Sequence, residues 1–331
     1  MTFLELLKQA SLPEKIYPIF KELYESYSQS VIQSGGSMDV YNIHFETLLR
    51  LVQEQLKNPY LFEPYHRKIT HPFNYFQFGV DFIRPLVDQR RSRVLHLDHV
   101  GQMAQHLKKR ENVILFSNHQ TEVDPQLIAI ALEESYPEIG KNMIFVAGDR
   151  VITDPMAIPF SKGCNLLCIY SKRYIHVPPE KKSEKQLHNQ KTMKKMQELL
   201  SEGGYCIYVA PSGGRDRPNE QGEVVVAPFD PQSIEMFRLI ADHAARPTHF
   251  YTLALATYHI LPPPNEIQSE LGEQRKIKRE GIYFSFGAEV DMENFPCELS
   301  PSQLTDRHAK RIARAHYLWN VVRSDYHTLT L

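Results

Sequence analysis

The spacing of apolar residues divides the 331-residue chain into a helical first part and a mixed second part. Up to about residue 75, apolar side chains recur every three or four positions, as in IYPIFKELYESY (16–27) and VYNIHFETLLRLVQEQL (40–56). The stretch 58–75, rich in proline and aromatic residues, ends this pattern. We therefore predict a small helical bundle domain over 1–75 and a second domain over 76–331.

In the second domain, short apolar runs alternate with helical patterns. Five runs have the length and residue types of strands: NVILFS (112–117), MIFVA (143–147), YCIYVA (205–210), FYTLALA (250–256) and IYFSFG (282–287). Helical patterns such as 126–136 and 188–202 lie between them. This order predicts an α/β fold with a mixed, largely parallel sheet flanked by helices. In such sheets, ligands bind at the loops that follow the carboxyl ends of the strands.

Composition and charge exclude several classes of protein. Lys and Arg (38) nearly balance Asp and Glu (39), so no overall field attracts nucleic acid, and we expect no nucleic-acid partner. The apolar runs are much shorter than the roughly 18–20 residues of a membrane span, so we expect a soluble protein with at most peripheral membrane contact. The four cysteines show neither metal-site nor disulfide spacing, and we expect Cys164 and Cys168 to be buried and inert.

The first candidate for chemistry is SNHQTEVDP (117–125), which directly follows an apolar strand. TEVD has the form of a capping box, so we predict that a helix begins at Thr121 with Asp124 in its first turn. From there the carboxylate can turn back to His119, fix its tautomer and leave its other nitrogen free to take a proton. This pattern suits a general base and its partner, although Asp124 read alone also fits a helix cap.

The second candidate is APSGGRDRP (210–218), which also follows a strand. Its proline and paired glycines predict a tight turn. Arg215 and Arg217 are two apart in an extended loop, so their guanidinium groups can face the same way and suit a phosphate. The alternative is a surface turn in which Asp216 bridges a neighbouring arginine.

The third candidate is a pair of basic residues, Lys172 and Arg173, which follows the apolar run LLCIY. These two side chains can add positive charge to the same anion site, or they can be solvated like most exposed basic pairs. In the motif AGDR, we expect Arg150 to pair with Asp149 or Asp154 and not with a ligand.

Taken in order, these motifs match one family. The match includes SNHQTEVDP, FVAGDRVITDP, NLLCIYSK, PSGGRDRP, APFD (227–230) and LPPP (261–264), and it covers roughly residues 110 to 290. Over this range the sequence resembles the soluble glycerol-3-phosphate 1-O-acyltransferases of plant plastids and certain bacteria. The helical first 75 residues agree with the helical bundle that begins the members of that family.

The resemblance implies a role for each candidate residue. By it, His119 is the general base, Asp124 orients it, and Arg215 and Arg217 bind the phosphate of glycerol 3-phosphate.

The same resemblance places Lys172 and Arg173 where the family has a basic pair in the phosphate site. The plant members have a histidine after this pair, whereas this chain has Tyr174. A tyrosine can donate a hydrogen bond to the phosphate but cannot carry positive charge, so Arg173 would contribute more of the binding.

The implied reaction moves a fatty acyl group from an acyl thioester to the sn-1 hydroxyl of glycerol 3-phosphate and gives lysophosphatidic acid, the first step of phospholipid synthesis. A thioester is already activated, so we expect no metal, cofactor or covalent enzyme intermediate. Backbone N–H groups near Thr121 are candidates for stabilising the oxyanion. The resemblance implies a location in the plastid stroma for a plant source or the cytoplasm for a bacterial one.

The implied acyl donor is acyl-carrier protein, in preference to acyl-coenzyme A. Acyl-carrier protein is strongly acidic, so we predict that basic clusters at 106–111 or 191–195 help to dock it.

Two other functions stay open. One is 1-acylglycerol-3-phosphate acyltransferase, the next enzyme of the pathway, which needs an apolar platform to take its acceptor from a membrane; the early helices offer no strongly basic amphipathic face for that. The other is a non-catalytic phosphate- or lipid-binding protein in which His119 and Asp124 are structural.

Overall fold

A computed structural model describes residues 2–171, 175–264, 272–297, 300 and 306–331. Its centre is a sheet of eight strands in the order β1-β5-β4-β6-β3-β9-β10-β2. The strands are β1 (Tyr65–His66), β2 (Arg93–Leu95), β3 (Asn112–Ser117), β4 (Ile144–Gly148), β5 (Asn165–Ile169), β6 (Cys206–Val209), β9 (Thr248–Ala256) and β10 (Tyr283–Phe286). A two-stranded ribbon, β7 (Arg217–Pro218) and β8 (Val224–Val225), lies apart from this sheet.

The five central strands, β5, β4, β6, β3 and β9, all run parallel. The antiparallel pairings lie farther out, where β1 pairs with β5 and β10 pairs with β9. The sheet is therefore mixed and largely parallel, as the alternation of apolar runs and helical patterns predicts.

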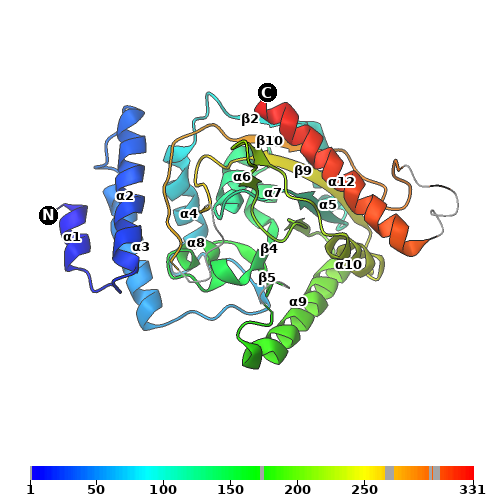
Figure 1. Cartoon of the computed structure of the whole chain (residues 1–331), viewed down its shortest axis with the longest axis horizontal. Helices are drawn as coiled ribbons and strands as arrows, with labels where there is room; N and C mark the ends of the chain where they lie inside the picture. The colour runs from blue at the N-terminus through cyan, green and yellow to red at the C-terminus, as the bar shows by residue number, and fades with distance from the viewer. Residues whose placement is uncertain (1, 172–174, 265–271, 298–299, 301–305) are drawn as a thin grey trace.

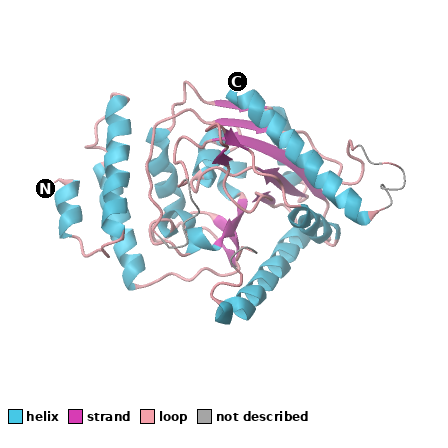
Figure 2. Ribbon diagram, viewed as in Figure 1, coloured by secondary structure: helices cyan, strands magenta, loops and turns pink. Residues whose placement is uncertain are grey.

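Helices cover both faces of the sheet (Figure 2). Alternate residues of β3 face opposite layers: Val113 and Leu115 pack into one core cluster, and Ile114 and Phe116 into another. The first cluster includes buried side chains of α4 (Tyr75–Ile83), α5 (Leu97–Lys108), α6 (Asp124–Leu132) and α7 (Pro137–Asn142). The second includes side chains of α9 (Lys182–Glu202), α10 (Pro231–Asp242) and α12 (Arg307–Thr330). Because both faces are covered, β3 is fully buried.

The N-terminal helices α1 (Phe3–Gln9), α2 (Ile16–Gln33) and α3 (Asn42–Lys57) stand side by side at one end of the molecule, next to α4 and α8 (Ile158–Ser161) (Figure 1). Their buried side chains belong to the same core cluster as one face of the sheet. The Tyr27 hydroxyl also donates a hydrogen bond of 2.9 Å to the carbonyl of Phe82, at the end of α4. The division into two domains at residue 75 stays a prediction.

Short 3₁₀ helices lie between some of these elements. They are η1 (Arg84–Leu86), η2 (Asp149–Ile152) and η4 (Pro179–Lys181). No helix among the described residues has both the length and the apolar character needed to cross a membrane.

The C-terminal helix α12 is the longest described element that the apolar pattern did not predict. It lies along β9 and contacts α10 (Figure 1). Arg314, which is buried in α12, donates hydrogen bonds to the Met292 carbonyl and to Glu235 of α10. A buried arginine interrupts the apolar stripe by which such a helix is recognised in a sequence.

Candidate active site

The predicted motifs meet at one edge of the sheet, because each follows the carboxyl end of a central parallel strand. The loop with His119 follows β3, the turn at Arg150 follows β4, and the loop with Arg215 and Arg217 follows β6. Thr257 directly follows β9. This is the edge at which ligands bind in open α/β sheets.

His119 and Asp124 form a hydrogen-bonded pair. The Nδ1 atom of His119 lies 2.8 Å from Oδ2 of Asp124. The Asp124 side chain is 1% exposed, whereas that of His119 is 29% exposed. The carboxylate thus fixes the imidazole from inside the protein, and the exposed ring keeps its Nε2 atom for a ligand.

Asp124 is held from three further directions. Its Oδ2 atom accepts hydrogen bonds from the backbone N–H groups of Gln120 (2.9 Å) and Thr121 (3.2 Å). Its Oδ1 atom accepts one of 2.6 Å from the hydroxyl of Thr257. A carboxylate that accepts this many hydrogen bonds is held in one orientation, and it orients the histidine.

These contacts correct one prediction and narrow another. Helix α6 begins at Asp124 and not at Thr121, since the residues before it form a loop that wraps around the carboxylate. The N–H groups of Gln120 and Thr121 donate to Asp124, and that of Val123 lies 3.4 Å from the Thr121 hydroxyl. These three N–H groups are engaged within the loop, so they do not fit the predicted role at the oxyanion.

A second buried carboxylate, Asp216, joins the histidine loop to the arginine loop. Its Oδ2 atom accepts hydrogen bonds from the side-chain amides of Asn118 (2.7 Å) and Gln120 (3.2 Å), and its Oδ1 atom accepts from the N–H of Ala227 (3.0 Å). Its own N–H donates to the carbonyl of His119 at 2.6 Å. Burial raises the pKa of Asp216 to about 6, although these hydrogen bonds act to lower it.

Asp216 therefore does not bridge a neighbouring arginine, which was the alternative interpretation of this loop. It turns inward, and the two arginines beside it reach the segment that follows β9. Arg217 donates to the carbonyl of Pro264 (2.7 Å), and Arg215 forms a two-pronged ion pair with Glu273 (2.6 and 2.7 Å).

Arg150 joins this group of charges, with its Nη1 atom 3.8 Å from Glu273. The expectation that it pairs with Asp149 or Asp154 is wrong. Burial and the nearby charge of Arg215 lower the pKa of Arg217, which reflects the crowding of like charges. Three guanidinium groups around one carboxylate keep an excess of positive charge, which suits a phosphate.

The other predicted residues have different outcomes. Lys172, Arg173 and Tyr174 lie outside the described residues. Cys164 and Cys168 are buried, as predicted, and burial raises the pKa of each thiol to about 12, which disfavours the reactive thiolate.

Sequence reasoning missed a buried ion-pair group that fixes the same loop. Arg275, which is 4% exposed, donates to both carboxylate oxygens of Glu122 and to Asp154 (3.1 Å). Glu122 lies between His119 and Asp124, so this group ties the histidine loop to the segment after β4. The sequence signal that could have indicated this group is the run of polar residues at 117–122, which directly follows a fully apolar strand.

Comparison with known proteins gives the family to which the chain is similar. Residues 100–257 match the family model described as Acyltransferase. The chain is 40% identical over 311 residues to "Glycerol-3-phosphate acyltransferase, chloroplastic" of Pisum sativum, covering 92% of this chain and 68% of that protein. Proteins of the same name are 41% identical in Carthamus tinctorius (87% and 63% covered) and 37% identical in Arabidopsis thaliana (92% and 67% covered). The chain thus spans about two thirds of the length of these relatives.

Among solved structures, the chain is similar to a 1-acyl-sn-glycerophosphate (LPA) acyltransferase, PlsC, of Thermotoga maritima. The identity is 16% and the TM-score 0.40, over 77% of this chain and 78% of that chain.

Proposed function

Because the chain belongs to the glycerol-3-phosphate acyltransferase family, we propose that it transfers a fatty acyl group from an acyl thioester to the sn-1 hydroxyl of glycerol 3-phosphate. The observation that carries this proposal is the pair of His119 and Asp124, whose imidazole is fixed on one side by a buried carboxylate and open on the other. That arrangement is the one a general base for an alcohol requires.

In the proposed reaction, the sn-1 oxygen forms a bond to the thioester carbonyl carbon while its proton passes to Nε2 of His119. The C–S bond of the resulting tetrahedral adduct then breaks, and the imidazolium gives the proton to the leaving thiolate. Protons and charges balance within this exchange, so the proposal needs no metal, cofactor or covalent enzyme intermediate. Asp124 stabilises the imidazolium that forms between the two steps.

We propose that Arg215 and Arg217 bind the phosphate of the acceptor, with Arg150 adding positive charge. Glu273 occupies two N–H groups of Arg215, which leaves three of its five donors for the phosphate. The N–H···O contact of 2.6 Å between Asp216 and His119 sets the distance between this phosphate site and the base.

For the donor, we propose acyl-carrier protein, and the positions of the two predicted docking clusters favour one of them. Residues 106–111 come just before β3, so the length of that strand, roughly 20 Å, separates them from His119. Lys191 and Lys194 are exposed on α9, and Asn189 of the same helix holds the carboxyl end of β5 through hydrogen bonds with the backbone of Tyr170. We therefore place the docking surface at 191–195. The relatives are named chloroplastic, and we propose the plastid stroma, or the cytoplasm of a bacterial source.

The test is acyl transfer by the purified chain with acyl-carrier-protein and coenzyme A thioesters, each offered with glycerol 3-phosphate or with lysophosphatidic acid. We expect 1-acylglycerol 3-phosphate as the product. His119→Ala should lower kcat by roughly 10²- to 10⁴-fold while glycerol 3-phosphate still binds. The matched control is His243→Ala, which removes an exposed histidine at the end of α10.

Two results would overturn the proposal. Activity on lysophosphatidic acid alone would keep the acyl-transfer chemistry and replace the acceptor. Unchanged ligand binding by His119→Ala, with no turnover in either protein, would favour the non-catalytic alternative.

A further inference from the structure

A second group of histidines and carboxylates lies at the opposite edge of the sheet. His106 is in the last turn of α5, Glu111 comes just before β3, His249 is the second residue of β9, and Glu289 follows β10. The Nδ1 atom of His106 lies 2.7 Å from Oε2 of Glu111, and Nε2 of His249 lies 3.0 Å from the same oxygen. On its other side, Nδ1 of His249 lies 2.6 Å from Oε1 of Glu289.

The number of protons in this group does not match the number of contacts. Each neutral imidazole carries one N–H, so two neutral rings supply two donors for three short N···O contacts. In the third contact, the lone pair of a ring nitrogen would face the lone pair of an ionised carboxylate. A cation bound between the two rings and Glu111 would remove this mismatch.

The residue types indicate which cation fits. One ligand atom each from His106, Glu111 and His249 can be chosen so that all three lie within 4.8 Å of one another. Glu289 lies at the other nitrogen of each ring, with Oε1 2.6 Å from Nδ1 of His249 and Oε2 3.7 Å from Nε2 of His106, so it can orient both imidazoles. Two imidazole nitrogens and one carboxylate oxygen, with a fourth position left for water, are a ligand set for Zn²⁺ and neighbouring divalent transition metals. A divalent ion would also balance the two carboxylates while both imidazoles stay neutral.

We propose that His106, Glu111 and His249 form a binding site for a divalent transition metal, with Zn²⁺ as the best fit and Glu289 orienting both rings. These three ligand side chains are between 18% and 24% exposed, so the site is close enough to the surface for an ion to enter. The ion would join α5, β9 and the residue that precedes β3. This inference does not depend on the proposed acyl transfer.

Distance excludes a direct role in catalysis. His249 and Thr257, the residue that holds Asp124, are eight positions apart along β9 and its end, which corresponds to roughly 26 Å.

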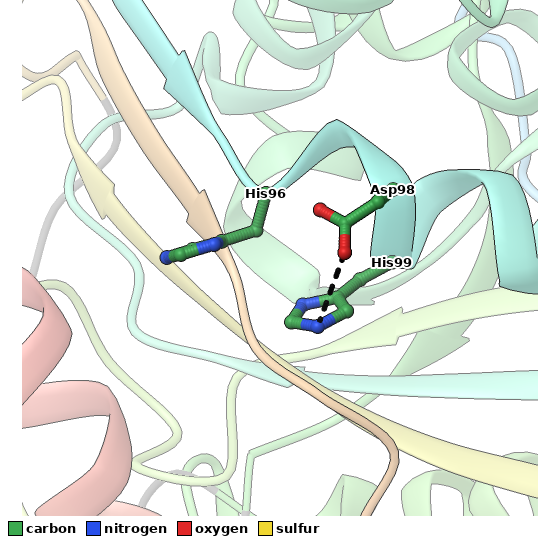
Figure 3. Close-up of side chains that lie close together, drawn as sticks. All are labelled: His96, Asp98 and His99. Carbon is green, nitrogen blue, oxygen red and sulfur yellow. Dashed lines mark ion pairs between the residues drawn. The ribbon is translucent and has the colours of Figure 1, made fainter.

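A similar set of residue types, His96, Asp98 and His99, offers an internal comparison (Figure 3). The His99 ring lies beside Asp98, with Nε2 3.7 Å from Oδ2, and the His96 and His99 rings are stacked with their centroids 5.4 Å apart (Figure 3). The Asp98 side chain is 72% exposed. The Nδ1 atom of His99 lies 2.7 Å from the Phe286 carbonyl, so one N–H satisfies that contact and no further cation is required.

The test starts with the full chain stripped of metal and dialysed against Zn²⁺, followed by elemental analysis and thermal unfolding with and without a chelator. We expect about one Zn²⁺ per chain and a Tm that falls by several degrees when the metal is removed. Replacement by Co²⁺ should give the visible absorption bands of a low-symmetry site. His249→Asn and Glu111→Gln should abolish stoichiometric binding, whereas the matched variant His96→Asn should keep it.

Each contrary result overturns the inference. If the wild type retains no Zn²⁺ and its Tm does not respond to Zn²⁺, then the missing charge is a proton shared by the imidazoles. If Zn²⁺ is retained by His249→Asn and lost in His96→Asn, the metal belongs to the other cluster. The measurements on the wild type decide the question even if a variant does not fold.

Discussion

Both edges of the sheet hold histidines and carboxylates, but the two edges differ in whether every carboxylate contact has an N–H or O–H donor. At the carboxyl edge, His119 makes one contact with a carboxylate, and the four acceptor contacts of Asp124 all have a donor. At the amino edge, His106 and His249 share Glu111, and the contacts outnumber the N–H groups. Strands β3 and β9 contribute to both places.

The difference shows what separates a reactive histidine from a structural one. A histidine with one satisfied nitrogen and one exposed nitrogen can take and return a proton. A histidine with a carboxylate at each nitrogen cannot satisfy both contacts with its single N–H, so its place suits a bound cation better than proton transfer. Sequence proximity to acidic residues does not distinguish the two cases, since Glu111 is five residues from His106 and Asp124 is five residues from His119.

The strongest test of this contrast removes the charge of Asp124. In Asp124→Asn, the neutral amide can no longer stabilise an imidazolium. Both oxygens of Asp124 accept hydrogen bonds, so the NH2 group of the asparagine must face N–H or O–H donors. We expect kcat to fall by roughly 10²- to 10⁴-fold, as measured by single-turnover acyl transfer. The matched change at the amino edge is Glu202→Gln, where an exposed carboxylate accepts from Tyr205, and kcat should not change. Equal losses in both variants would contradict the assignment.

A second test concerns Asp216, whose pKa burial raises from an ordinary 3.8 to about 6. The folded protein then holds this proton more tightly than the unfolded chain does, so the group's contribution to stability is greatest below pH 3.8 and is lost as pH rises through 6. The loss amounts to about 3 kcal/mol. Asp216→Asn removes this titration, so the free energy of unfolding of the wild type minus that of the variant should fall by about 2–2.5 kcal/mol between pH 4 and pH 7, the part of the loss that lies in this range.

Urea unfolding at a series of pH values measures that difference. At pH 7 the variant also loses about 1–3 kcal/mol, because one amide cannot accept from both Ala227 and the side-chain amides of Asn118 and Gln120. Asp98→Asn, at an exposed carboxylate, should give a curve parallel to the wild type. A constant difference for Asp216→Asn across the range would show that its pKa is ordinary.

A third test separates binding from proton transfer within the carboxyl edge. Arg215→Gln removes a charge-assisted donor of the proposed phosphate site, so KM for glycerol 3-phosphate should rise roughly 10- to 100-fold with little change in kcat. Initial rates at varied acceptor concentration measure both constants, and Tm shows whether the loss of the ion pair with Glu273 has unfolded the loop. A fall in kcat at unchanged KM would place Arg215 with the base.

The smallest expected effect concerns the donor. Lys191→Glu with Lys194→Glu reverses two exposed charges on α9, and KM for acyl-carrier-protein thioesters should rise roughly 2- to 10-fold while KM for glycerol 3-phosphate stays constant. The matched variant is Lys108→Glu with Lys109→Glu, two exposed charges at the amino edge, which should leave both KM values unchanged. Equal effects of the two variants would contradict the proposed docking surface.

The sequence predicts the elements whose signal is local. The run NVILFS coincides with β3 (Asn112–Ser117), because a strand buried on both faces is continuously apolar. The spacing of His119 and Asp124 predicts their contact because the signal is again local: one short loop joins His119 to Asp124 at the start of α6. Helix α6 begins later than its apparent capping box because the Asp124 carboxylate accepts N–H groups of the loop before it.

The rest could not be predicted, since it depends on partners far apart in the chain. Asn118 and Asp216 are 98 positions apart, and Thr257 and Asp124 are 133 apart. Arg275 reaches Glu122 over 153 positions. No periodicity encodes such pairings, and a buried polar residue in a sequence looks the same as a solvated one.

The backbone bond between Asp216 and His119 has a consequence for redesign. Together with the hydrogen bonds from the amides of Asn118 and Gln120 to the Asp216 carboxylate, it fixes the histidine loop and the arginine loop relative to each other. Anyone who wishes to give this scaffold a different acceptor would have to transplant both loops as one cassette, because a foreign arginine loop without its own aspartate would leave the base without its support.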